Sequence, residues 1–173
     1  MSSALRHRNL PQLLLQSREA LMRRFRPLLN EQGVTEQQWR ILRALLEEGP
    51  LEPRQLGERC LISSPSIAGV LLRMHDAGLI ARERMDHDLR RVRVSLTAQG
   101  RRLGQRMAPQ VENRYADLEA VLGVERLQKV YDVLDDMLDR LGRPDLGAAA
   151  DAEDPPAATR PSAANARRRG AAR

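Results

Sequence analysis

The chain has 173 residues, a mass of 19.5 kDa, a net charge of +6 and a pI of about 10.7. This length suffices for one hydrophobic core without disulfides or metals. Only 2% of the residues are aromatic, which disfavours β-sandwiches, β-barrels and RNA-binding folds that stack bases on rings. The single cysteine, Cys60, excludes an intrachain disulfide and a cysteine-based zinc site. No apolar run approaches a membrane span or an export signal, so we expect a cytoplasmic, mostly helical protein with no membrane contact.

Positive charge concentrates in the middle of the chain. Residues 54–106 carry eleven basic and five acidic side chains, whereas residues 107–142 carry four and eight. A localised basic segment in a folded domain is typical of proteins that bind polyanions. Because almost every basic residue is Arg, a solvated arginine-rich surface is the alternative interpretation.

The first third of the chain predicts two helices. Apolar residues recur at near-helical spacing over residues 10–30, and Gly33 ends that segment. Thr35 then begins a second helix, with Gln38 three residues later in a capping-box pattern. Gly49 and Pro50 end this second helix.

Two shorter helices follow. Pro53 suits the first turn of a helix that reaches about Cys60. A serine cap and a proline in the first turn predict that the next helix begins within residues 63–66 and ends at Gly78. One face of that helix is apolar, with Ile67, Val70, Leu71 and Met74. The other face carries small or cationic residues, namely Ser64, Ser66, Ala68, Gly69 and Arg73.

A β-hairpin and two long helices complete the predicted fold. We expect a first strand over residues 79–85, a polar connection over residues 86–90, and a second strand in which Val92, Val94 and Leu96 alternate with polar residues. Thr97 caps a helix that Gly123 ends, and a last helix covers residues 124–141. Residues 142–173 are rich in Ala, Pro and Arg, which predicts a disordered tail.

The segment 52–96 therefore has the order helix, turn, helix, strand, basic loop, strand, which is a winged helix-turn-helix. The second helix of such a unit lies in the DNA major groove, and serines and amides at its N-terminus suit base edges and phosphates. An arginine at the hairpin tip suits the minor groove. The candidate DNA-binding residues are Ser63, Ser64, Pro65, Ser66, Arg73, His87, Asp88, Arg90 and Arg91.

Asp88 needs its own explanation, because a carboxylate at a DNA-facing tip repels phosphate. We infer that Asp88 pairs with Arg90, two residues further on, and fixes the geometry of the guanidinium. An ordinary charged turn is the alternative.

In the order and spacing of four segments, the sequence resembles the MarR family of winged-helix transcription regulators. Residues 14–20 and 35–41 resemble in particular the regulators of homoprotocatechuate degradation operons. The wing departs from the family pattern, since it has His87 and Leu89 where a proline and paired arginines are common. The four segments are Thr35-Glu36-Gln37-Gln38-Trp39, residues 56–78 followed by Leu79-Ile80, Asp88-Leu89-Arg90, and Ser95-Leu96-Thr97-Ala98-Gln99-Gly100.

The resemblance implies a homodimeric repressor that binds a pseudo-palindromic operator in double-stranded DNA. Residues 10–34 and 98–141 would form the dimerisation helices, residues 35–97 the DNA-binding lobe, and residues 1–9 a flexible N-terminus. The heptad-like apolar pattern of the last helix independently fits a helical dimer interface. The family also implies a cavity between the dimerisation helices and the lobe, where a small aromatic acid binds and relieves repression.

An aromatic carboxylate calls for a bidentate arginine and an apolar wall. The candidates are Ser17, Arg18, Trp39 and Arg40. The alternatives are an ion pair at the dimer interface for Arg18, a core position for Trp39 and a surface position for Arg40.

Other functions find less support. The three histidines, His7, His75 and His87, lack metal-ligand spacing, so we expect no metal and no cofactor. Cys60 ends a helix on an apolar face and is expected to be a buried thiol; an oxidant sensor is the alternative. A winged-helix module that binds another protein is a further alternative. No catalytic triad, carboxylate pair or phosphate loop indicates an enzyme.

Overall fold

The computed structural model describes residues 6–85 and 88–144, so most of the predicted tail, with Arg167, Arg168 and Arg169, lies outside the described residues. The described part is mostly helical with one antiparallel two-stranded sheet, as predicted. None of its helices is long and apolar enough to cross a membrane. The elements are α1 (Leu10–Glu31), α2 (Glu36–Glu48), α3 (Pro53–Cys60), α4 (Ser64–Asp76), β1 (Ile80–Met85), β2 (Asp88–Leu96), α5 (Ala98–Leu122) and α6 (Val124–Leu141).

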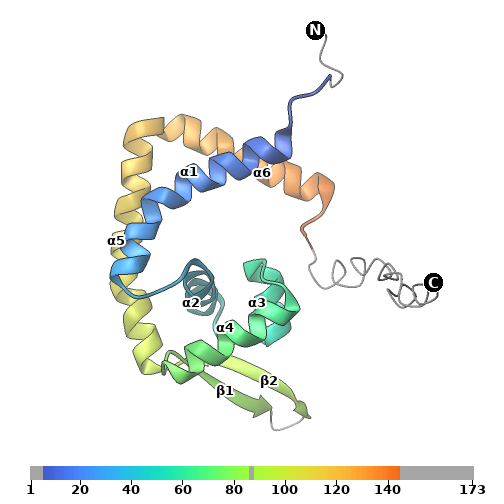
Figure 1. Cartoon of the computed structure of the whole chain (residues 1–173), viewed down its shortest axis with the longest axis vertical. Helices are drawn as coiled ribbons and strands as arrows, with labels where there is room; N and C mark the ends of the chain where they lie inside the picture. Colours follow the sequence, from blue (N-terminus) through green and yellow to red (C-terminus); the bar gives the residue numbers. More distant parts are fainter. Residues whose placement is uncertain (1–5, 86–87, 145–173) are drawn as a thin grey trace, which may run out of the picture.

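The elements form a lobe and a helical arm (Figure 1). Helices α2, α3 and α4 and the β1–β2 hairpin gather at one end of the molecule, and α1 and α6 cross at the other. The long helix α5 joins the two ends and contacts α1, α2, β2 and α6. The recognition helix expected from the sequence, α4, and the hairpin therefore lie together, away from α1 and α6, whereas α5, also predicted to dimerise, begins beside the hairpin.

Local signals in the sequence set most element boundaries. The Thr35 hydroxyl accepts a hydrogen bond from the Gln38 amide at 3.2 Å, and the Gln38 side chain accepts one from the Thr35 amide at 2.9 Å. Thr97 caps α5 by accepting from the Gly100 amide at 3.0 Å. Gly78, with a φ of +68°, follows α4 in the left-handed region that glycine adopts without strain. These predicted starts and stops are confirmed.

One local prediction is wrong, and a second is confirmed only in part. Residues 88–90, expected in the connection, belong to β2, and Met85 pairs with Asp88 after a register shift at Arg84 and Met85. Outside the core, β1 and β2 stay paired through backbone hydrogen bonds. These bonds do not require the alternation of apolar and polar residues from which the strand was predicted. Ser63 occupies the N-cap of α4, as predicted, but its side chain makes no cap bond to the backbone; its hydroxyl donates to the Ser66 hydroxyl at 3.0 Å.

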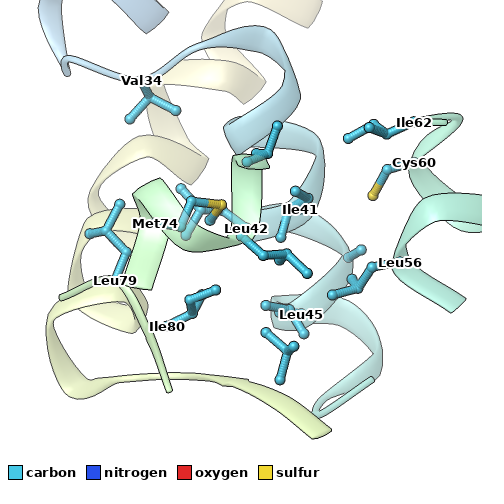
Figure 2. Close-up of a cluster of buried hydrophobic side chains, with 14 of the residues drawn as sticks. Val34, Ile41, Leu42, Leu45, Leu56, Cys60, Ile62, Met74, Leu79 and Ile80 are labelled. Atoms are coloured by element: carbon cyan, nitrogen blue, oxygen red, sulfur yellow. The ribbon is translucent and has the colours of Figure 1, made fainter. Parts of the chain in front are cut away.

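One buried core fills the lobe (Figure 2). Ile67, Val70, Leu71 and Met74, the predicted apolar face of α4, are each at most 5% exposed. They pack with side chains of α2, α3 and β1, among them Ile41, Leu42, Leu45, Leu56, Cys60 and Ile80. Because this face of α4 is buried, its opposite face, with the serines and Arg73, points to solvent.

A close backbone contact fixes the start of α5 on the lobe. A Cβ on Gly100 would lie 2.0 Å from the Leu79 carbonyl oxygen, far inside van der Waals contact. Thr97 also donates a hydrogen bond to the Gly78 carbonyl at 2.6 Å. Only glycine at position 100 allows α5 to leave the hairpin along this path.

Gly100→Ala is therefore expected to destabilise the fold by roughly 1–3 kcal/mol, because the backbone must shift to admit the methyl group. Gly69→Ala is the matched control within a helix. A Cβ there would lie 3.5 Å from Arg73 Nη1, an ordinary contact, so helix propensity should stabilise the control by up to about 1 kcal/mol. Urea unfolding measures both free energies, and equal midpoints for the two variants would contradict this role of Gly100.

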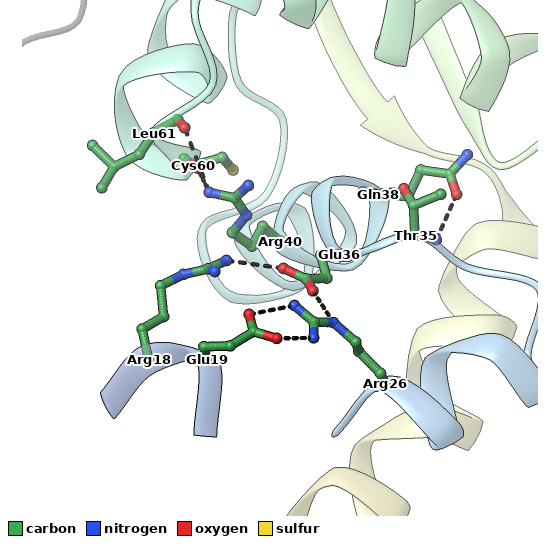
Figure 3. A network of polar contacts seen from close by, with 9 residues as sticks. All are labelled: Arg18, Glu19, Arg26, Thr35, Glu36, Gln38, Arg40, Cys60 and Leu61. Atoms are coloured by element: carbon green, nitrogen blue, oxygen red, sulfur yellow. Dashed lines mark hydrogen bonds and ion pairs between the residues drawn. The ribbon is translucent and has the colours of Figure 1, made fainter. Parts of the chain in front are cut away.

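An ion-pair network fastens the lobe to α1 (Figure 3). Glu36, in the first turn of α2, accepts hydrogen bonds from Arg18 Nη2 at 2.9 Å and from Arg26 Nε at 2.7 Å. Arg26 in turn binds Glu19 through both terminal nitrogens. Burial raises the pKa of Glu36, but the hydrogen bonds from Arg26 and Arg18 outweigh it, so this pKa lies below its usual 4.5. The hydrogen bond from Arg26 likewise lowers the pKa of Glu19.

A carboxyl whose pKa is lowered by folding stabilises the protein fully above its unfolded pKa, and this stability is lost as the pH falls through the folded pKa. We expect the melting temperature to fall below about pH 4.5 in the wild type. The fall should be smaller in Glu36→Gln, which has already lost the charge. Glu31→Gln, at an exposed position outside the network, serves as the control. Identical acid profiles for both variants would contradict the stabilising role of Glu36.

Candidate functional site

The exposed face of α4 carries the residues predicted to meet DNA. Ser63, Ser64, Pro65, Ser66 and Arg73 are all exposed. Proline stands in the first turn, where its missing amide breaks no helical hydrogen bond. This face therefore offers hydroxyl groups and one guanidinium at the surface of a helix packed firmly on the lobe.

The hairpin is described in part. His87 lies outside the described residues, and of Asp88 and Arg90 only the backbone, in β2, is described. The inferred pair between Asp88 and Arg90 stays a prediction. Arg91 is exposed and forms an ion pair with Glu52, the residue before α3. The spacing of the sequence did not indicate this link between the wing and α3.

The described arginines divide into two groups. Most arginines of α1, α3 and α6 have a carboxylate partner, for example Arg54 with Glu58 at 2.8 Å and Arg140 with Asp136 at 2.8 Å. A second group has no acidic partner among the described residues. Within residues 54–106 it comprises Arg73 on α4, Arg82 and Arg84 on β1, Arg93 on β2, and Arg101, Arg102 and Arg106 on α5. Guanidinium groups without a carboxylate partner are available for phosphates, and the basic segment carries seven of them; others, such as Arg24 on α1, lie outside it.

A cavity of about 190 Å³ lies between α1, α2 and α5. For comparison, an apolar cavity of about 150 Å³ holds one benzene molecule. A small aromatic compound therefore matches the size of this cavity. Its lining residues are Arg18, Met22, Phe25, Leu29, Glu36, Trp39, Arg40, Arg43, Val111 and Tyr115.

Aromatic rings converge on this cavity. The chain has only four aromatic residues, and Phe25, Trp39 and Tyr115 line this one site. Phe25 and Tyr115 pack with ring centroids 5.2 Å apart and planes tilted by 59°. Such tilted pairs are a favourable arrangement for rings and offer a third ring both faces and edges.

Arg43, which the sequence analysis missed, adds a positive charge to the cavity. It donates to Glu47 Oε1 at 2.6 Å and lines the cavity together with Tyr115. Interactions with Glu47 and Tyr115 raise the pKa of Arg43, although burial opposes them. The only feature of the sequence that could have pointed to Phe25 and Tyr115 as cavity residues is the scarcity of aromatic residues. No feature of the sequence pointed to Arg43.

Three of the four predicted ligand-binding residues line the cavity. Arg18, Trp39 and Arg40 all line the cavity, whereas Ser17 is not a lining residue and donates to the Leu13 carbonyl at 2.8 Å within α1. Arg18 does form an ion pair, but its partner is Glu36 of the same chain. Trp39 is half-buried, packed on the core and open to the cavity at once.

Arg40 also forms hydrogen bonds outside the cavity. Its Nη1 donates to the Cys60 carbonyl and, at 3.5 Å, to the Leu61 carbonyl, at the end of α3 (Figure 3). Leu61 has a φ of +49°, so these carbonyls turn away from the helix and need a donor. The Nε of Arg40 is buried and has no hydrogen-bond partner among the described residues. Arg40 thus joins the cavity to the helix-turn-helix.

Cys60 is buried, as expected, and 4% exposed. Burial raises the pKa of its thiol to about 11, although Arg40 and Arg59 oppose the shift. At neutral pH the group is a thiol rather than the thiolate that oxidants attack. This environment gives no support to the oxidant-sensor alternative.

Known proteins share this architecture. Residues 32–91 match the model of the MarR family. The HTH-type transcriptional regulator FarR of Neisseria gonorrhoeae is 43% identical over 121 residues, which are 70% of this chain and 83% of that protein. The homoprotocatechuate degradative operon repressor of Escherichia coli is 38% identical over 132 residues, 76% of this chain and 89% of its own.

A solved structure is similar over the same range. The crystal structure of NadR in complex with 4-hydroxyphenylacetate is 40% identical and superposes with a TM-score of 0.70, covering 79% of this chain and 97% of that one. The helix-turn-helix, the wing, the unpaired arginines and these relatives lead to one assignment. The chain belongs to the MarR family of winged-helix, DNA-binding transcriptional regulators.

Proposed function

We propose that this protein is a dimeric, sequence-specific repressor in the cytoplasm that a small aromatic carboxylate releases from DNA. The observation that carries the proposal is the cavity, in which three of the four aromatic side chains and three arginines meet between α1 and the DNA-binding lobe. The Escherichia coli relative, a homoprotocatechuate degradative operon repressor, supports an operon for the breakdown of aromatic compounds as the target.

The DNA-binding surface consists of α4 and the wing. The N-terminus of α4, with Ser63, Ser64, Pro65 and Ser66, meets base edges in the major groove. Arg73 stands further along the same face of α4, and the hairpin arginines without an acidic partner among the described residues neutralise phosphates. The predicted tip residues His87, Asp88, Arg90 and Arg91 extend this contact toward the adjacent minor groove.

A second copy of the chain covers the helical arm. The large apolar side chains exposed on α1 and α6 are more than isolated surface residues, and such patches mark interfaces. A two-fold dimer would set two α4 helices against half-sites about one turn of DNA apart. The exposed side chains are Leu10, Leu13, Leu14, Leu15 and Leu21 on α1, and Val124, Val130, Tyr131, Val133, Leu134 and Leu141 on α6.

The effector binds with its ring among Phe25, Trp39 and Tyr115 and its carboxylate on a guanidinium. Arg43 is our first candidate for the donor, because it lines the cavity together with Phe25, Trp39 and Tyr115, and Tyr115 carries a hydroxyl as a second polar group. Arg18 and Arg40 stand at the same cavity, and Ser17 stays a candidate at its edge. An anion here also competes with Glu36 for Arg18, which couples the cavity to the fastening between α1 and the lobe.

Variants of two arginines test the DNA interface. Each phosphate contact that is removed should make the slope of log K against log salt shallower by about 0.9, because fewer counterions are released. Arg93→Gln, on the hairpin, should therefore flatten the slope and weaken binding to all sequences. Arg24→Gln on α1 also removes an exposed arginine without an acidic partner among the described residues, and it should leave the slope unchanged. Equal slopes for the two variants would remove the hairpin from the DNA interface.

Tryptophan fluorescence tests the proposed effector site. Trp39 is the only tryptophan and lines the cavity, so its fluorescence reports binding there. Titration with 4-hydroxyphenylacetate, the compound bound to NadR, should change this emission. Arg43→Gln should weaken the apparent affinity at least about tenfold, as expected for a lost charged hydrogen bond. Arg114→Gln, on α5 and paired with Asp117 outside the cavity, should bind like the wild type. An Arg43 variant of unchanged affinity would refute the assignment.

A further inference from the structure

The outward face of α4 has an exposed leucine at its centre. The buried face fixes the rotation of the helix, and the helical period then places Pro65, Gly69, Leu72 and Asp76 along the middle of the opposite face. Leu72 is the one large apolar side chain in this row, and it is 53% exposed. The lobe has no structural use for a leucine there, because the core of α4 lies on the other side.

Arg73 lies beside this leucine and turns back along the helix. Its Nη1 is 3.5 Å from the point that a Cβ on Gly69 would occupy, so the guanidinium rests over the turn that precedes it. Arg73 has no acidic partner among the described residues. The exposed face of α4 contains no Asn, Gln or Lys, so Arg73 is its main group for a bidentate bond to a base edge.

The positive charge around α4 indicates which kind of partner binds its exposed face. Arg82, Arg84 and Arg93, which have no acidic partner in the described part of the chain, belong to β1 and β2, and this hairpin lies at the same end of the molecule as α4 (Figure 1). A surface with this charge selects a polyanion, and the major groove of DNA admits a helix. The apolar group that the floor of the major groove presents is the 5-methyl group of thymine.

We infer that Leu72 reads a thymine methyl group in each half-site, next to a guanine that Arg73 binds through O6 and N7. This inference rests on the proposed DNA-binding function and adds to it the chemistry of one base step. Arginine on guanine and an apolar contact on the thymine methyl each discriminate between base pairs.

The test uses the full-length protein and the duplex that it selects from a random-sequence library. Each thymine of that duplex is replaced by uracil, which removes only the methyl group. For the wild type we expect one position per half-site where uracil weakens binding about fourfold, the effect of burying one apolar carbon. Leu72→Ala should bind the thymine and uracil duplexes equally at that position. Leu61→Ala removes a leucine of similar exposure, 50%, at the end of α3, and should keep the wild-type penalty.

The neighbouring guanine is tested in the same way. Replacing it with 7-deazaguanine removes the N7 acceptor, which should weaken the wild type about tenfold and leave the already weaker Arg73→Ala unaffected. Leu72 and Arg73 are exposed, so unchanged melting temperatures verify that both variants fold. A selected duplex with no uracil-sensitive thymine, or a full penalty that persists in Leu72→Ala, would overturn this inference alone. Failure to select any duplex would overturn the proposed function together with it.

Discussion

The carboxylate of Glu36 is the interaction on which the geometry of the molecule depends. It stands in the first turn of α2, where the helix dipole favours a negative charge, and accepts hydrogen bonds from Arg18 and Arg26 of α1. Through these bonds the DNA-binding lobe is held at one orientation to the arm. The same carboxylate lines the cavity. An anion bound there would therefore compete with Glu36 for Arg18, which connects α1 to the lobe.

This arrangement would give the proposed effector a physical route to the DNA-binding surface. The cavity lies between α1 on one side and α2 on the other, and Arg40 extends from it to the carbonyls at the end of α3. A ligand that binds Arg18 would weaken its ion pair with Glu36 at the start of α2, and a ligand that binds Arg40 would weaken its hydrogen bonds to the end of α3. In the proposed dimer, a small rotation of each lobe alters the separation of the two α4 helices, which the operator fixes.

Local features of the fold were predictable from the sequence, and contacts between distant segments were not. Thr35, Thr97 and Gly78 mark their element boundaries through bonds to residues within a few positions, so spacing alone reveals them. The cavity joins Phe25, Arg43 and Tyr115 from three helices, and no local pattern records that meeting. The hairpin was placed correctly, but β2 begins earlier than predicted, because backbone pairing outlasts the apolar alternation.

The central claim is that an aromatic acid in this cavity controls the affinity for DNA. The most direct measurement titrates the full-length protein onto the duplex upstream of its own gene, at several salt concentrations, with and without a panel of aromatic acids. The account predicts tight binding that weakens with salt and that at least one acid abolishes. Specific binding that no aromatic acid affects would contradict the role of the cavity, and complex formation independent of salt would contradict the DNA interface itself.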